Sequence, residues 1–325
     1  MSFVGISREG IYPRFPKLKT YQKNLRPPPK AWNVERLAAL KRFSKEGPFY
    51  LSREAKRPFG PGLASTFLLS VGLDKACDAI QAALRGEDDW FEPWRQWVSY
   101  AYWSHRVSTV WNVHGRPQVL NSAGVPYAER YASLFLARIG ATIGNCLSLG
   151  WTEFAISLTE STNASLRTGT VVDGGHWGSR RTQHFMLRLV GDWQGWPPRQ
   201  PTKSKDSKIA FDEPLFNALA ENWRTTDLAA IEFLLLAACD RHTQQSRTDS
   251  GNKFCDMRDL EHYFDPFEVL SVLRLRELNG LENPSIDHLL TASQLGRLQP
   301  VSQPYHDELL DGLLRHGKQA WFPEL

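Results

Sequence analysis

Large aromatic residues recur at helical spacing from residue 90 onward, and this pattern is the strongest constraint on the fold. Residues of one helical face follow at i, i+4, i+7 and i+11: Trp90, Trp94, Trp97 and Ala101. Asp89, with Glu92 three residues later, predicts a capping box at the start of this helix. So regular a stripe of large side chains is more typical of a helix facing a core than of a ligand platform.

Apolar residues at similar spacing predict helices through most of the chain. Besides short helices at 31–45 and 182–193, we expect helices near 63–84, 90–111, 127–143, 151–164, 225–241, 266–279 and 306–316. At 265–268, Asp265 is expected to cap a helix, Pro266 to open it and Glu268 to complete a capping box. No stretch alternates strongly enough to predict a sheet. The expected fold is all-α, either a multi-helix bundle or an irregular stacked-helix array.

Charge is distributed unevenly along the chain. Residues 1–60 contain 14 Lys and Arg against 4 Asp and Glu, whereas residues 201–325 contain 13 against 20, so their net charges are +10 and −7. Prolines in residues 1–30 favour extended backbone. We therefore interpret residues 1–60 as an extended basic arm with a short helix. Residues 61–325 form the helical domain, with a candidate subdivision at the proline-marked 194–212 loop.

The basic arm has two interpretations. Its lysines and arginines alternate with aromatic residues, a pattern that can bind nucleic acid through phosphate neutralisation and base stacking. Alternatively, the arm packs along the acidic last third of its own chain, because the two charges are complementary. Docking within the chain is favoured, so nucleic acid is not the expected partner.

The chain has none of the motifs that identify the common enzyme classes: GxxxxGK[ST], GxGxxG after a strand, HExxH or GxSxG. A glycine-rich loop ending in Arg180 and Arg181 could hold an anion, but a surface loop is the favoured interpretation. The four cysteines lie far apart without a CxxC pair and are expected to be buried thiols. We expect no catalytic residues, no cofactor and no metal, although a helical enzyme without a sequence signature remains an alternative.

The histidines provide two candidate chemical patterns. His242, His288 and His306 each stand beside an aspartate, but adjacent residues on a helix point about 100° apart, so exposed polar residues are the favoured interpretation. His262, Asp265 and Glu268 are metal-ligand types at i, i+3 and i+6. The expected role of Asp265 and Glu268 in capping argues against a metal site.

Targeting signals are not apparent. The sequence begins MSFVGISREGIYPRF, which lacks the apolar run of a signal peptide. No stretch approaches the roughly 18 apolar residues that span a bilayer. The expected location is the cytoplasm, without a membrane partner.

Residues 125–322 resemble the helical immunity proteins of bacterial toxin–immunity systems, including those paired with type VI secretion effectors. The resemblance rests on the segments YAERYASLFLARIGATIGNCLSLGWTEFAISLTE and DPFEVLSVLRLRELNGLENPSIDHLLTASQLGRL. It implies a protein that binds a cognate toxin and blocks its active site. It transfers no functional residue to this chain.

A toxin that acts on nucleic acid should have a basic cleft, and carboxylates of the acidic last third would be attracted to it. We expect exposed acidic residues around residues 242–258 and at the end of the 266–279 helix to contact this partner. The candidates are Asp249, Asp256, Asp259, Glu261, Glu277 and Glu282.

Overall fold

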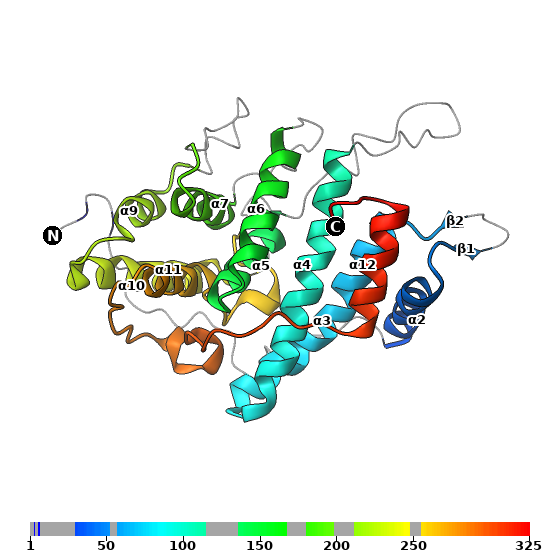
Figure 1. Cartoon of the computed structure of the whole chain (residues 1–325). Helices are drawn as coiled ribbons and strands as arrows, with labels where there is room; N and C mark the ends of the chain where they lie inside the picture. The colour runs from blue at the N-terminus through cyan, green and yellow to red at the C-terminus, as the bar shows by residue number, and fades with distance from the viewer. Residues whose placement is uncertain are drawn as a thin grey trace.

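The computed structural model describes residues 3, 6, 30–52, 57–114, 136–167, 180–197, 211–247 and 255–325. Within these residues ten α-helices form an irregular bundle, which confirms the predicted all-α class. The hairpin of α3 (Pro61–Arg85) and α4 (Phe91–Val113) has α2 (Lys30–Glu46) and α12 (Glu308–Ala320) on one side (Figure 1). The other side holds α5 (Leu136–Ser148), α6 (Thr152–Arg167), α7 (Arg181–Trp193), α9 (Pro214–Asn222), α10 (Leu228–Gln245) and α11 (Phe267–Leu278).

The predicted aromatic face of α4 is a core face. Trp94 and Trp97 are 4% and 2% exposed. Gly72 on α3 allows this close packing, because a Cβ atom there would lie 2.9 Å from the ring of Trp97. The two helices can therefore approach each other with the tryptophan ring between them.

The predicted capping box at the start of α4 is wrong. Residues Asp88–Trp90 form a 3₁₀ turn that leads directly into α4. Trp90, which precedes the first helical residue, already has helical angles of φ −67° and ψ −28° and makes no side-chain cap. Asp89 therefore lies within the turn and not in the extended conformation that a capping residue needs.

Helix α5 is enclosed by its neighbours. It packs against α4, α6, α7 and α11, and most of its residues are buried. The helix predicted at 127–143 overlaps it only in part, because residues 115–135 lie outside the described residues and α5 continues to Ser148. Among the helices of the last third, α11 is the one that packs extensively against α5.

Two short elements were not predicted. Helix α9 is only nine residues long and has few apolar positions from which to recognise a period. Strands β1 (Tyr50–Ser52) and β2 (Arg57–Pro58) form a small antiparallel ribbon, with Tyr50 opposite Pro58 and Ser52 opposite Arg57. The ribbon follows α2 and leaves the fold class unchanged.

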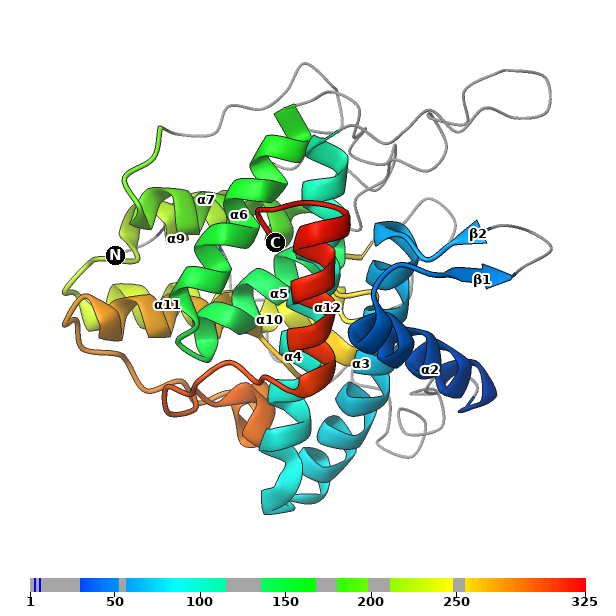
Figure 2. The same ribbon diagram turned by 45° about the vertical axis from the view of Figure 1, so that its right-hand side comes forward.

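Helices from opposite ends of the chain pack together. In the turned view α12 lies between α4 and α2 (Figure 2). Phe43 of α2 stacks on Trp321 just after α12, with ring centroids 4.5 Å apart. The Ser44 hydroxyl donates a hydrogen bond of 3.0 Å to the Glu308 carbonyl. The predicted short basic helix is thus part of the packed bundle.

Replacing Gly312 with alanine is expected to lower the free energy of unfolding by about 1–3 kcal/mol through overpacking. The new Cβ atom would lie 2.1 Å from the Ser44 hydroxyl and 2.4 Å from its carbonyl oxygen, so α2 and α12 would have to separate. Urea denaturation measures the change.

The matched control is Gly191 in α7, whose added Cβ atom would meet its nearest neighbour at 3.6 Å. Alanine at that position should stabilise the protein by up to about 1 kcal/mol through helix propensity. If both substitutions stabilised the protein, the proposed close packing of α2 and α12 would be incorrect.

The start of the chain contacts its acidic last third. The ring of Phe3 stacks on Phe233 of α10 at a centroid distance of 6.0 Å, and Ile6 also packs against the core. These contacts are apolar, and the basic residues between Ile6 and Lys30 lie outside the described residues, so docking of the arm by charge stays a prediction.

In the part of the chain that the structure describes, no helix combines the length and the apolar character needed to cross a bilayer. All four cysteines lie in that part, and each is buried without a disulfide, as predicted.

Candidate functional site

Two of the acidic candidates are internal, contrary to the exposure expected for them. Asp256 is buried and accepts hydrogen bonds from the Thr182 backbone N–H at 3.2 Å and from its hydroxyl at 2.8 Å. The Arg241 guanidinium lies 2.7 Å from the same carboxylate. Burial by itself would raise the pKa of Asp256, but Arg241 and Thr182 outweigh it and hold that pKa below its usual value. Asp256 therefore ties α7 to α10.

Glu261 is the second internal candidate, and Asp259 is partly buried beside it. Both carboxylates face Arg138 of α5. Glu261 Oε1 lies 3.3 Å from Arg138 Nε, and Asp259 Oδ1 lies 3.4 Å from Arg138 Nη2. A packed arginine that joins two carboxylates fixes the position of a loop. The sequence pattern missed this role because the arginine is more than a hundred residues away. Asp249, the remaining candidate of this loop, lies outside the described residues.

The last two candidates remain exposed and flank an apolar side chain. Glu277 and Glu282 are both exposed, and Leu278 between them is 47% exposed. We call Glu277, Leu278 and Glu282 the acidic edge. Glu277 also accepts a 2.6 Å hydrogen bond from Arg274, so one of its oxygens is directed along the helix.

A buried arginine, Arg276, fixes the backbone around the acidic edge through hydrogen bonds. The Arg276 guanidinium donates to the carbonyl oxygens of Trp223 at 2.7 Å and Thr225 at 2.8 Å, and it also donates to the Glu282 carbonyl. These bonds bring the α9–α10 loop and the segment after α11 together. Asp227, which caps α10 at the end of the α9–α10 loop, is also exposed.

A second candidate site is a cluster of buried histidines and carboxylates at the start of α11. We call it the histidine centre and define it by His105 of α4, His242 of α10, His262, Asp265 and Glu268. The predicted capping box at this place is wrong, because Pro266 precedes α11 without a side-chain cap. Glu268 instead contacts a histidine from another helix.

His242 makes the best-defined contacts of this centre. Its Nε2 lies 2.9 Å from the His262 carbonyl oxygen, which can only accept, and its Nδ1 lies 2.9 Å from Glu268 Oε1. An imidazole that donates at both nitrogens is charged. Burial alone would lower the pKa of His242, but the Glu268 carboxylate outweighs burial and raises it. The geometry therefore favours an imidazolium–carboxylate pair.

Burial has different effects on the neighbouring groups. It lowers the pKa of His105 to about 3, with smaller contributions from Arg138 and His262. It raises the pKa of Asp265, against the opposing influence of His262 and Asn145. Burial therefore favours a neutral His105 and opposes the ionisation of Asp265.

Several polar atoms of the centre are buried and have no hydrogen-bond partner among the described residues. They are His105 Nε2, Asn145 Oδ1, both ring nitrogens of His262, Asp265 Oδ2 and Glu268 Oε2. Each such atom costs about 1–3 kcal/mol. The whole stability of a domain is only about 5–15 kcal/mol. So many unpaired atoms in one place distinguish this cluster from an ordinary packed core.

The expectation that the histidines beside aspartates are exposed is correct only for His306. His288 is buried, and its Nε2 lies 3.2 Å from Asp240 Oδ1. Its Nδ1 accepts a 3.1 Å hydrogen bond from the Leu290 backbone N–H and so caps a 3₁₀ turn. The sequence argument considered only adjacent residues, whereas these contacts join different segments.

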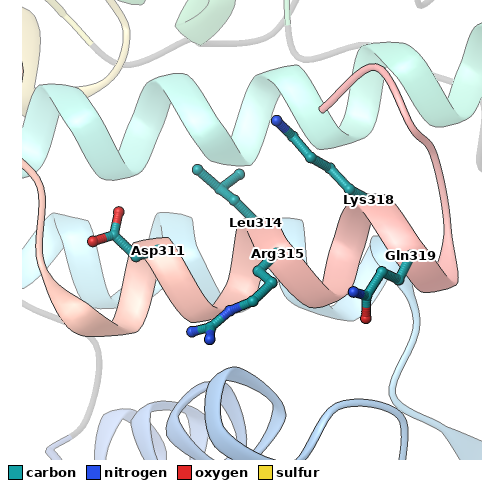
Figure 3. A pocket seen from close by; sticks show the side chains of 5 residues that line it. All are labelled: Asp311, Leu314, Arg315, Lys318 and Gln319. Carbon is teal, nitrogen blue, oxygen red and sulfur yellow. The ribbon is translucent and has the colours of Figure 1, made fainter.

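The surface also has a shallow hollow on α12 of about 450 Å³. It is lined by Asp311, Leu314, Arg315, Lys318 and Gln319. Leu314 and Lys318 point to one side of the helix and Arg315 to the other (Figure 3). Because these side chains diverge, we assign the hollow no chemistry. In the described ranges, no three His, Cys, Asp or Glu side chains are arranged to hold a metal ion.

Comparisons with protein-family models, with curated proteins and with solved structures found no match to this chain.

Proposed function

We propose that this chain is an immunity protein, which binds a cognate bacterial toxin and blocks its active site. The observation that carries the proposal is the acidic edge, where exposed carboxylates flank the exposed Leu278. An apolar contact within a charged rim is the usual anatomy of a protein interface. Complementary charge on the partner would speed their association.

The chemistry of the edge favours a toxin with a basic cleft, such as a nuclease. Enzymes that act on nucleic acid bind phosphates with lysine and arginine, and carboxylates can occupy the same positions. We propose that the two proteins meet in the cytoplasm, where such a toxin finds its substrate, and that a type VI secretion system delivers it. Of the six acidic candidates, Glu277 and Glu282 are the ones that this proposal retains as contacts.

Growth of cells that produce the toxin tests this function. The protein encoded by the adjacent gene is produced from an inducible promoter, with or without this chain. Growth should stop when that protein is produced alone and resume when this chain is present. Purification should then recover the two proteins as a stoichiometric complex. If growth stopped equally with and without this chain, and no complex formed, the proposed function would be rejected for this toxin.

A further inference from the structure

The unpaired atoms of the histidine centre require partners that can both donate and accept hydrogen bonds. Asn145 Oδ1 only accepts, whereas the Asp265 carboxyl group accepts when ionised and can also donate when protonated. Both ring nitrogens of His262 are buried without a hydrogen-bond partner among the described residues, and an imidazole ring nitrogen can either donate or accept. A water molecule donates two hydrogen bonds and accepts two, so a single species can meet all these demands.

The spacing within the centre also fits a bridging molecule. His262 Nδ1 lies 3.8 Å from Asp265 Oδ2, which is within the distance of an ion pair but longer than a direct hydrogen bond. Where two polar atoms lie more than about 3.5 Å apart, a water molecule can bond to both. His262 and Asp265 are 3% and 2% exposed, so a water molecule at this position would be shielded from bulk solvent and would exchange slowly.

From these contacts we infer that the histidine centre binds at least one internal water molecule, which bridges His262 and Asp265 and reaches Asn145. Water fits better than a metal ion, because no three ligand-type side chains of the described residues are arranged around a common point. The site joins α5 to the segment that begins α11. It is independent of the proposed partner and of the acidic edge.

Magnetic relaxation dispersion of ¹⁷O-labelled water tests the inference in solution, because it counts long-lived internal water molecules. The wild-type protein is compared with His262→Phe, in which an apolar ring replaces the polar one. The control is His306→Phe at an exposed histidine outside the centre. We expect His262→Phe to lose at least one long-lived water molecule and His306→Phe to lose none.

A crystal structure of the wild-type protein provides a second measurement that does not depend on the variant folding. Electron density for a water molecule within hydrogen-bond distance of His262 and Asp265 would support the inference. Density showing His262 bonded directly to Asp265, with no solvent between them, would overturn it. An anomalous signal would show a metal ion at this position and would also overturn it.

Discussion

Replacing Arg276 with alanine is expected to lower the free energy of unfolding by about 3–5 kcal/mol. Its side chain is fully buried, and its guanidinium donates to carbonyl oxygens of Trp223, Thr225 and Glu282. Alanine removes all of these donors and leaves buried acceptors beside a cavity. The shift of the urea denaturation midpoint measures the loss.

Arg224 is the control for this prediction, because it is another arginine of the same region but lies at the surface. It is 47% exposed and pairs with Asp192. Exposed ion pairs contribute about 0–1 kcal/mol, so Arg224→Ala should change the stability little. Equal and small effects of the two substitutions would mean that Arg276 does not hold the loops beneath the acidic edge.

Acidification is expected to destabilise the protein through His105. Because burial lowers the pKa of His105 to about 3 in the folded protein, its stabilising contribution is complete above the unfolded value of about 6.5 and is lost as the pH falls toward 3. Between pH 7 and pH 4 this loss amounts to about 3 kcal/mol, at 1.4 kcal/mol for each pH unit below the unfolded pKa.

Other buried groups of the centre act in the opposite direction. The pKa values of His242 and Asp265 are raised on folding, so their contributions are present at low pH and are lost as the pH rises through the folded values. The His105 contribution is therefore isolated by comparing the wild-type protein with His105→Gln across the pH range. Between pH 7 and pH 4, the free energy of unfolding of the variant should fall by about 3 kcal/mol less than that of the wild-type protein. If the two proteins lost stability in parallel, His105 would not be held neutral by burial.

The fold was predictable where local periodicity and tertiary packing agree. The tryptophan face of α4 and the leucines of α12 repeat with the period of the helix that they form, and the nearly continuous apolar run of α10 is typical of a buried helix. Short α9 and the β1–β2 ribbon have too few residues for a period to emerge. The two predicted capping boxes failed because the local pattern Asp-x-x-Glu does not fix the first residue of the helix: Trp90 and Pro266, and not the predicted aspartates, directly precede α4 and α11.

The candidate sites were less predictable, because burial of a polar residue depends on partners distant in sequence. Asp256 and Glu261 were expected to be exposed, but Arg241 and Arg138 draw them into the structure. His242 and Glu268 are 26 residues apart and meet only because α10 and α11 pack together. The exposed position of Glu277 and Glu282 was predictable from the end of the helix, where side chains project beyond the last packed turn.

Stopped-flow association with the toxin recovered in the growth experiment tests the central claim, that the acidic edge contacts a basic partner. The double variant Glu277→Lys/Glu282→Lys is compared with Glu35→Lys/Glu46→Lys, which makes the same charge change at exposed residues of α2. At low salt we expect the edge variant to associate at least about tenfold more slowly, with a weaker salt dependence, because charge complementarity steers encounter. The α2 variant should retain the wild-type rate. An unchanged rate for the edge variant, together with loss of binding when residues 1–30 are deleted, would contradict the account and identify the basic arm as the contact surface.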